Sequence, residues 1–169
     1  MRAAVLAVLA LLLAGCSGTP SASQAPHPAT AEGQALADVA FVHGSAGPWA
    51  VAGYRMSAFA LKELALTRGS FDLLIVHHTP HAVKYSCIAD GAAAQSGASV
   101  GKLNLTLVDS DIAGLETVFT NKKSGQRVAM RPTAAFQARF ATFPMGEARA
   151  HGQQVLSLRD EDIFEVVSR

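Results

Sequence analysis

The side chains best suited to chemistry are concentrated in one stretch of about sixty residues, and each lies at the end of a predicted element. Their types are those that bind transition metals: His43, His77, His78 and Cys87. Zinc accepts imidazole nitrogen and thiolate sulfur alike, so this set predicts metal-ligand chemistry. The alternative is that the histidines end a turn and a strand and that the cysteine is buried and inert.

A strand predicted over residues 71–77 ends at the two adjacent histidines, His77 and His78. Its run of leucine, isoleucine and valine is typical of a strand that is covered on both faces. Side chains alternate along a strand, so His77 and His78 must point to opposite sides of the sheet if the strand extends to residue 78. Only one of the two is therefore expected at any given site.

A helix predicted over residues 87–95, with Ser86 as its N-cap, carries the cysteine. Cys87 and Asp90 are three residues apart and would share a face of that helix. A thiol in the first helical turn lies near the positive end of the helix dipole, which favours the thiolate. Asp90 is then expected to orient a ligand, or to act as a base toward a metal-bound water.

Two further polar residues flank the stretch. Ser45 lies in the turn after His43, where it could cap a second helix that opens with Pro48 and covers residues 49–66. That helix is apolar around much of its circumference, which predicts a central, mostly buried position. Lys102 begins a strand predicted over 102–107. Its side chain either contacts a ligand or is simply solvated.

The N-terminus carries a signal for export. Residues 3–14 form an unbroken apolar run that ends in Leu13-Ala14-Gly15-Cys16, which resembles the bacterial lipobox. We expect a signal peptide over 1–15, lipidation of Cys16, a linker over 16–34 rich in Ser, Pro and Ala, and one domain over 35–169. The protein is then exported and anchored to a bacterial membrane by lipid.

Charge limits the partners. Removal of the signal peptide takes away Arg2 and leaves 13 basic against 13 acidic residues, without a basic stripe. This argues against a nucleic acid partner. A lipidated Cys16 would leave Cys87 as the one remaining thiol of an exported chain. Self-association is compatible with the sequence.

The predicted elements alternate between helix and strand. A short helix at 35–42 is followed by the second helix, the histidine strand and the cysteine helix, then by strands near 102–107, 115–121 and 127–131. Helices over 133–140 and 146–155 follow, and 163–167 is either a last strand or the end of a short helix capped by Asp160. This order predicts an α+β domain with a mixed sheet.

Several of these blocks resemble the FmdE domain family, which takes its name from formylmethanofuran dehydrogenase. The family pattern has a His-Gly-x-x-Cys-Pro-Gly turn, a Gly-Tyr-Arg-Met helix, a Cys-x-x-Asp helix and a Gly-x-x-x-Gly-Lys-x-Asn-Leu segment that leads into a strand. Matching segments stand here in the same order, at residues 43–48, 53–56, 87–90 and 97–105.

The resemblance implies a mixed-sheet α+β fold, similar to the catalytic domain of glyceraldehyde-3-phosphate dehydrogenase. It also implies a metal site, with zinc as the expected ion, in the cleft between the first turn and the cysteine helix. His43 and Cys87 match family ligands, but the family's first cysteine falls on Gly47. A retained site would need another ligand, for which His77 or His78 is the candidate.

We therefore expect a membrane-anchored binding domain for a metal or a metal-bearing ligand. A small metal-dependent hydrolase or transferase is the first alternative, and a metal-free scaffold is the second. Formylmethanofuran chemistry itself is not expected, because the pterin-bearing catalytic subunits would have to work across the membrane from a lipoprotein.

Overall fold

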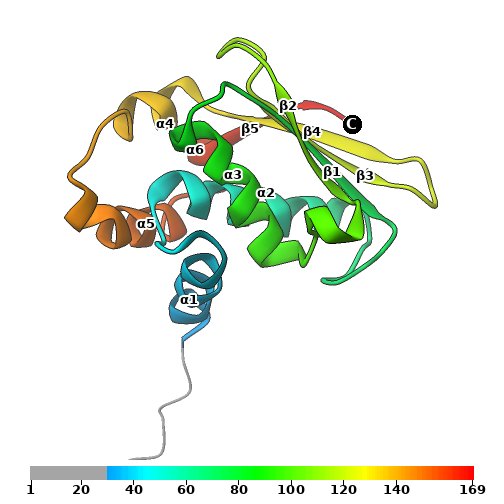
Figure 1. The fold of residues 1–169 in the computed structure, drawn as a ribbon, viewed down its shortest axis with the longest axis horizontal. Helices are drawn as coiled ribbons and strands as arrows, with labels where there is room; N and C mark the ends of the chain where they lie inside the picture. The colour runs from blue at the N-terminus through cyan, green and yellow to red at the C-terminus, as the bar shows by residue number, and fades with distance from the viewer. Residues whose placement is uncertain (1–29) are drawn as a thin grey trace, which may run out of the picture.

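The computed structural model describes residues 30–169 and contains a single α+β domain (Figure 1). The α-helices are α1 (Ala31–His43), α2 (Pro48–Glu63), α3 (Val83–Ser96), α4 (Ala134–Arg139), α5 (Ala148–Leu156) and α6 (Asp160–Ile163). The strands are β1 (Leu73–Thr79), β2 (Leu105–Asp109), β3 (Glu116–Asn121), β4 (Arg127–Pro132) and β5 (Phe164–Ser168). Two short 3-10 helices are η1 (Val100–Lys102) and η2 (Met145–Glu147).

The five strands form one mixed sheet in the order β2-β1-β3-β4-β5. Only the β1–β2 pair is parallel, and α3 supplies the crossover between these two strands. The other neighbours are antiparallel, and a tight turn joins β3 to β4. The predicted α+β class with a mixed sheet is confirmed.

The helices cover one face of this sheet (Figure 1). Along β1 the buried side chains alternate with half-buried ones, and the buried set points toward the helices: Leu73, Ile75, His77 and Thr79. The sequence-based expectation that this strand is covered on both faces is therefore wrong. Alternation does hold for the two histidines, since His77 is buried and His78 is half-buried on the other face.

Helix α2 is the central element, as its sequence predicts. Its buried residues include Trp49, Val51, Met56 and Leu61. Pro48 occupies the first helical turn, where its missing N–H costs nothing. Gly47, and not Ser45, is the N-cap residue, and no side chain caps this helix end.

Helices α2 and α3 cross with their backbones in contact, and two glycines make this possible. A Cβ on Gly53 would lie 1.9 Å from the carbonyl oxygen of Ile88. A Cβ on Gly91 would lie 1.7 Å from the carbonyl oxygen of Ala50. Because any larger residue would push the helices apart, the two glycines fix where α3 presents its side chains.

Arg55 fastens the C-terminal helices to α2. Its guanidinium donates to the carbonyls of Val155, Leu156 and Leu158 at 2.9–3.1 Å. It also donates to the carboxylate of Asp160 at 2.7 Å, at the start of α6. One side chain thus satisfies the carbonyls that the end of α5 leaves free.

Element boundaries differ from the sequence-based ones where local caps decide them. Helix α1 begins at Ala31, four residues before the predicted start, because Thr30 accepts a hydrogen bond from the Gly33 N–H and caps the helix. Strand β2 begins at Leu105, since residues 100–102 form η1 and Leu103 has a left-handed backbone with φ 55°. Residues 164–168 form the predicted last strand, and the short helix before it covers 160–163 with Arg159, and not Asp160, at its N-cap.

No helix among residues 30–169 is long and apolar enough to cross a membrane. The expected signal peptide, Cys16 and most of the expected linker fall outside the described residues.

Candidate ligand pocket

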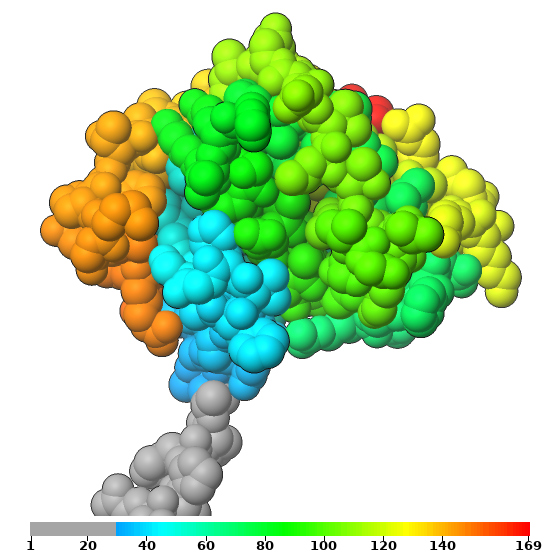
Figure 2. All heavy atoms as spheres, in the orientation of Figure 1, coloured from blue at the N-terminus to red at the C-terminus, as the bar shows by residue number. Residues whose placement is uncertain are grey.

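A cavity of about 380 Å³ opens where three distant segments meet. The segments are the α1–α2 turn, the first turns of α3, and the chain from Ala141 to Ala148 (Figure 2). In Figure 2 they correspond to the blue-to-cyan, green and orange parts of the surface. The lining is mostly apolar and includes Pro48, Trp49, Val83, Phe143, Met145 and Ala148. Its polar members are His43, Ser45, Lys84, Cys87 and Thr142.

His43 is the last residue of α1 and is held by Asp90 of α3. The imidazole Nδ1 lies 2.8 Å from the carboxylate Oδ2. A carboxylate can only accept, so Nδ1 carries the proton, and in the neutral form of the ring Nε2 has a free lone pair. A partner carboxylate of this kind orients a histidine that binds a metal or a ligand with its other nitrogen.

Cys87 lies on α3 and lines the same cavity, but it is not the activated thiol expected from the sequence. Helix α3 begins at Val83 after Ala82, so Cys87 is in the second helical turn and Ser86 is not the N-cap. Burial, with a contribution from the charge of Asp90, raises the pKa of the thiol to about 12. The Sγ donates to the carbonyl of Lys84 at 3.3 Å. Cys87 is therefore a neutral thiol at physiological pH.

His77 is not part of the cavity. It is fully buried beneath α3, and both ring nitrogens already have partners within the fold. Its Nδ1 lies 2.9 Å from the hydroxyl of Thr117, and its Nε2 lies 3.1 Å from the carbonyl of Tyr85. Because the carbonyl must accept, Nε2 carries the proton. Burial lowers the pKa of His77 to about 4, so at neutral pH the ring is neutral and Nδ1 accepts from the Thr117 hydroxyl.

His78 and Lys102 also lie away from the cavity. His78 is on the sheet face that α3 does not cover, and it is paired with Glu116 of the neighbouring strand β3. Lys102 donates to the carbonyl of Gly97 at 2.7 Å and lies 5.2 Å from the ring centroid of Phe71. The structure thus brings His43, Ser45, Cys87 and Asp90 together, and it separates them from His77, His78 and Lys102.

These positions do not fit a zinc ion bound by three protein ligands. Among residues 30–169, no three His, Cys, Asp or Glu side chains are arranged so that they could hold a metal ion. The physical reason is that His43 and Cys87 share the cavity while both nitrogens of His77 are engaged elsewhere. Gly47, which stands in place of the family cysteine, lines the cavity without offering a ligand.

The third wall of the cavity is not predicted from the sequence. Residues 141–148 are separated by more than forty positions from α3, and they carry no metal-ligating type except Glu147. Contacts from α2 and α3 hold this wall in place. Trp49 donates its indole N–H to the carbonyl of Phe140 at 2.9 Å, and Lys84 donates to the carbonyl of Ala141 at 2.8 Å. The signal that could have indicated a binding surface here is the apolar pair Phe143 and Met145 in an irregular segment.

The buried His77 predicts a pH dependence of stability. Its folded pKa of about 4 lies below the ordinary value of 6.5, so between these pH values the unfolded chain binds the extra proton. The neutral ring makes its full contribution to the free energy of unfolding above pH 6.5. The free energy of unfolding should fall by roughly 2 to 3 kcal/mol as the pH is lowered toward 4. Urea unfolding at pH 7 and 4.5 measures the decline, and we expect a smaller one in His77→Gln. Equal declines in the two proteins would contradict the assignment.

Comparison with known proteins supports the pattern of motifs. The model of the family described as "FmdE, Molybdenum formylmethanofuran dehydrogenase operon" matches residues 42–165, which include every wall of the cavity. No curated protein matches the chain significantly. Since the matched segment covers most of the 169 residues, the chain belongs to the FmdE family.

Proposed function

We propose that this FmdE-family chain is an exported, lipid-anchored binding domain for a small molecule with an apolar body and an acidic group. The observation that carries the proposal is the cavity between α1, α3 and residues 141–148. Concave, mostly apolar sites with a few convergent polar groups are the usual form of small-molecule sites. The lipobox-like sequence at Cys16 supports the anchor.

The apolar body of the ligand would rest against Trp49 and Phe143. The Trp49 ring packs edge-to-face with Tyr85 at 5.1 Å and with Phe136 at 5.3 Å, so this wall is rigid before a ligand arrives. A preformed wall lowers the entropy lost on binding.

The acidic group would be received by Lys84, whose ammonium lies 5.3 Å from the Trp49 ring centroid. At the other polar position, His43 offers Nε2 because Asp90 engages Nδ1. Cys87 offers a neutral thiol beside it. These groups would set the orientation of the ligand, while the apolar walls supply most of the affinity.

A metal-bearing ligand is the second candidate, favoured by the presence of one imidazole and one thiol in the same cavity. Two donors from the chain are fewer than the three or four that protein zinc sites use. A metal would therefore arrive with a ligand that brings the remaining donors. The hydrolase alternative is weaker, because Asp90, its intended base, is committed to orienting His43.

The family description names the operon of a molybdenum formylmethanofuran dehydrogenase, which links the family to that enzyme system in general terms. For this chain we assign ligand binding and not turnover, because an anchored exported domain would be separated by the membrane from pterin-bearing catalytic subunits.

Fluorescence of Trp49, the one tryptophan of the sequence, provides a direct test. The probe is 1-anilinonaphthalene-8-sulfonate, which combines an aromatic body with a fixed negative charge. We expect saturable binding that quenches Trp49 by energy transfer to the probe. Binding should weaken at least about tenfold in Ala141→Phe, where a new ring enters the cavity mouth and costs more than about 1.4 kcal/mol of binding free energy.

The matched control is Ala138→Phe, which adds the same ring to an exposed alanine of α4 that does not line this cavity. It should bind the probe as the parent chain does. Equal binding by all three proteins would place the probe elsewhere and remove the support for this pocket. If Lys84 receives the acidic group, Lys84→Met should weaken binding of the sulfonate probe more than binding of uncharged naphthalene.

A further inference from the structure

Several large apolar side chains project into solvent at one end of the domain, from α1, from η1 and from the loops next to η1 and β1. They are Phe41 at 91% exposure, Leu103 at 85%, Val100 at 72% and Phe71 at 68%. We call these four residues the apolar rim. Phe41 and Val100 border the same groove, which also contains the ion pair of Arg68 and Asp38 at 3.0 Å.

The rim is held in place by the fold. Lys102 lies 5.2 Å from the ring centroid of Phe71, so the two loops touch. The Gly69 N–H donates to the carbonyl of Ser96 at 2.7 Å and ties the Phe71 loop to the end of α3. These contacts hold the Phe71 loop beside η1, so Phe71 lies on the same surface as Val100 and Leu103.

Leu103 carries a second sign that its exposure serves a function. Its backbone is left-handed, with φ 55°, a conformation that costs a non-glycine residue energy. Leu103 ends η1, a left-handed position that glycine or asparagine would fill at less cost, yet a leucine stands there at 85% exposure. Backbone outliers of this kind cluster at functional sites.

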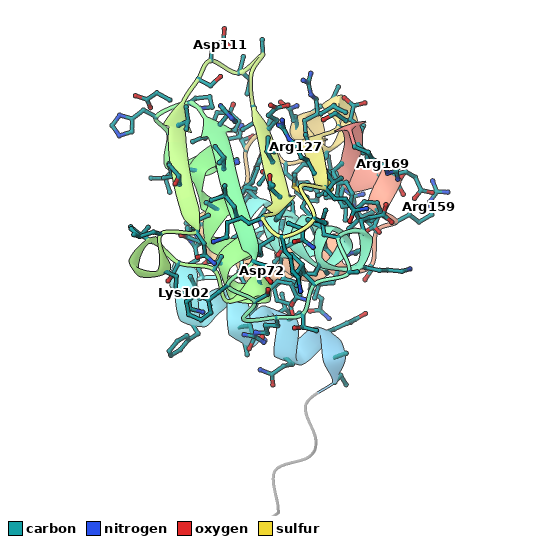
Figure 3. The ribbon with its side chains drawn as sticks, turned by 90° about the vertical axis from the view of Figure 1, so that its right-hand side faces the viewer. Asp72, Lys102, Asp111, Arg127, Arg159 and Arg169 are labelled. Carbon is teal, nitrogen blue, oxygen red and sulfur yellow. The ribbon has the colours of Figure 1, made fainter. Side chains whose placement is uncertain are left out.

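The rim lies toward the end of the domain at which the chain begins. In Figure 1 the first described residues of α1 lie at the lower end of the domain, on the side opposite the sheet. Figure 3 places Lys102 and Asp72, neighbours of Leu103 and Phe71, toward that end, whereas Asp111 lies at the far end. Thr30 is the fourteenth residue after Cys16, so the chain between them spans at most about 50 Å. A lipid on Cys16 would hold this end near the bilayer.

We propose that the apolar rim inserts into the surface of the membrane to which the chain is anchored. The proposal rests on the lipid anchor of the proposed function. Exposed aromatic and leucine side chains partition into the interfacial region, and an anchor raises their local concentration enough for weak insertion to matter. Around the rim, Lys102 and Asp72 balance, as do Arg68 and Asp38, and Asp90 of the same groove is paired with His43, so insertion should depend little on anionic lipid or salt.

An environment-sensitive dye tests the position of the rim. The mature chain, purified from membranes in detergent and reconstituted into phosphatidylcholine vesicles, is labelled with a nitrobenzoxadiazole dye at Val100→Cys. The matched control is Ile112→Cys, an exposed aliphatic residue beside Asp111 at the opposite end. Labelling of the parent chain, in which Cys87 is only 7% exposed, gives the background signal.

We expect a blue shift and at least about twofold brighter emission at position 100, with quenching by doxyl-labelled lipid, and neither effect at position 112. Aqueous spectra at both positions in an acylated protein would overturn the insertion. A blue shift without lipid quenching would also overturn it, since a second copy or another protein would then cover the rim. Mass spectrometry of the N-terminus separates these results from failure of the anchor: a chain without acyl groups overturns the proposed anchoring and this inference with it.

Discussion

Replacing Gly91 by alanine should greatly lower the free energy of unfolding of this domain, although intrinsic helix propensities alone predict a gain in stability. In an ordinary exposed helix the change from glycine to alanine stabilises by about 1 kcal/mol. Here the new Cβ would lie 1.7 Å from the carbonyl oxygen of Ala50, and backbone of the central helix cannot move aside. Because α2 and α3 must separate, we expect a loss of more than about 3 kcal/mol.

Thermal and urea unfolding of Gly91→Ala measure the loss. Gly101→Ala is the control, because a Cβ there meets no heavy atom within 4 Å, and it should stay within about 0.5 kcal/mol of the parent. Gly53→Ala probes the same crossing from the other helix, where the Cβ would lie 1.9 Å from the Ile88 carbonyl. If Gly91→Ala were as stable as the control, the close crossing of α2 and α3 would be wrong.

Replacing Gly47 by cysteine should turn the cavity into a zinc site. Gly47 has an extended backbone, with φ −74° and ψ 166°, which any residue can adopt. The first heavy atom that its Cβ would meet is the Ala148 Cβ at 3.9 Å, an ordinary contact. The new thiol would join His43 and Cys87 in one cavity and restore the ligand set of the FmdE pattern. We expect the variant to retain about one equivalent of zinc through gel filtration.

The parent chain should lose zinc under the same conditions, because it lacks the third donor. Gly47→Ser, which is similar in size but lacks the soft sulfur, is the matched control and should behave like the parent. Zinc uptake should raise the melting temperature of Gly47→Cys, since a ligand that binds only the folded state stabilises it. Stoichiometric zinc in the parent that is lost in Cys87→Ser would contradict this interpretation and restore the metal-binding function.

Local patterns in the sequence are enough to predict most of the fold. Alternation along the strand predicted at 71–77 and continued to His78 assigns His77 and His78 to opposite faces, and the apolar circumference of the helix predicted at 49–66 indicates its central position. The hairpin at 116–132 follows from its turn residues and alternating strands. These signals depend on neighbours along the chain, so they are readable without tertiary structure.

Sequence-based predictions fail where long-range packing decides the chemistry. The sequence places Cys87 in a first helical turn, but α3 begins four residues earlier at Val83, and burial against α2 then keeps the thiol protonated. His77 is a candidate metal ligand by type, whereas Thr117 and Tyr85 bind both of its nitrogens. A buried imidazole must satisfy its polar atoms, and its partners cannot be read from spacing.

The class of fold, the family motifs and the segment that contains most of the pocket can all be obtained from the sequence alone. Which of those residues meet depends on the tertiary structure, which pairs His43 with Asp90 across 47 positions and adds a wall from residues 141–148. The physical reason is the approach of α2 to α3 at Gly53 and Gly91, which sets the place of Cys87 at the cavity and of Asp90 beside His43. The residue types in the sequence show which chemical groups are available. The close packing of the helices decides which of these groups lie near enough to act together.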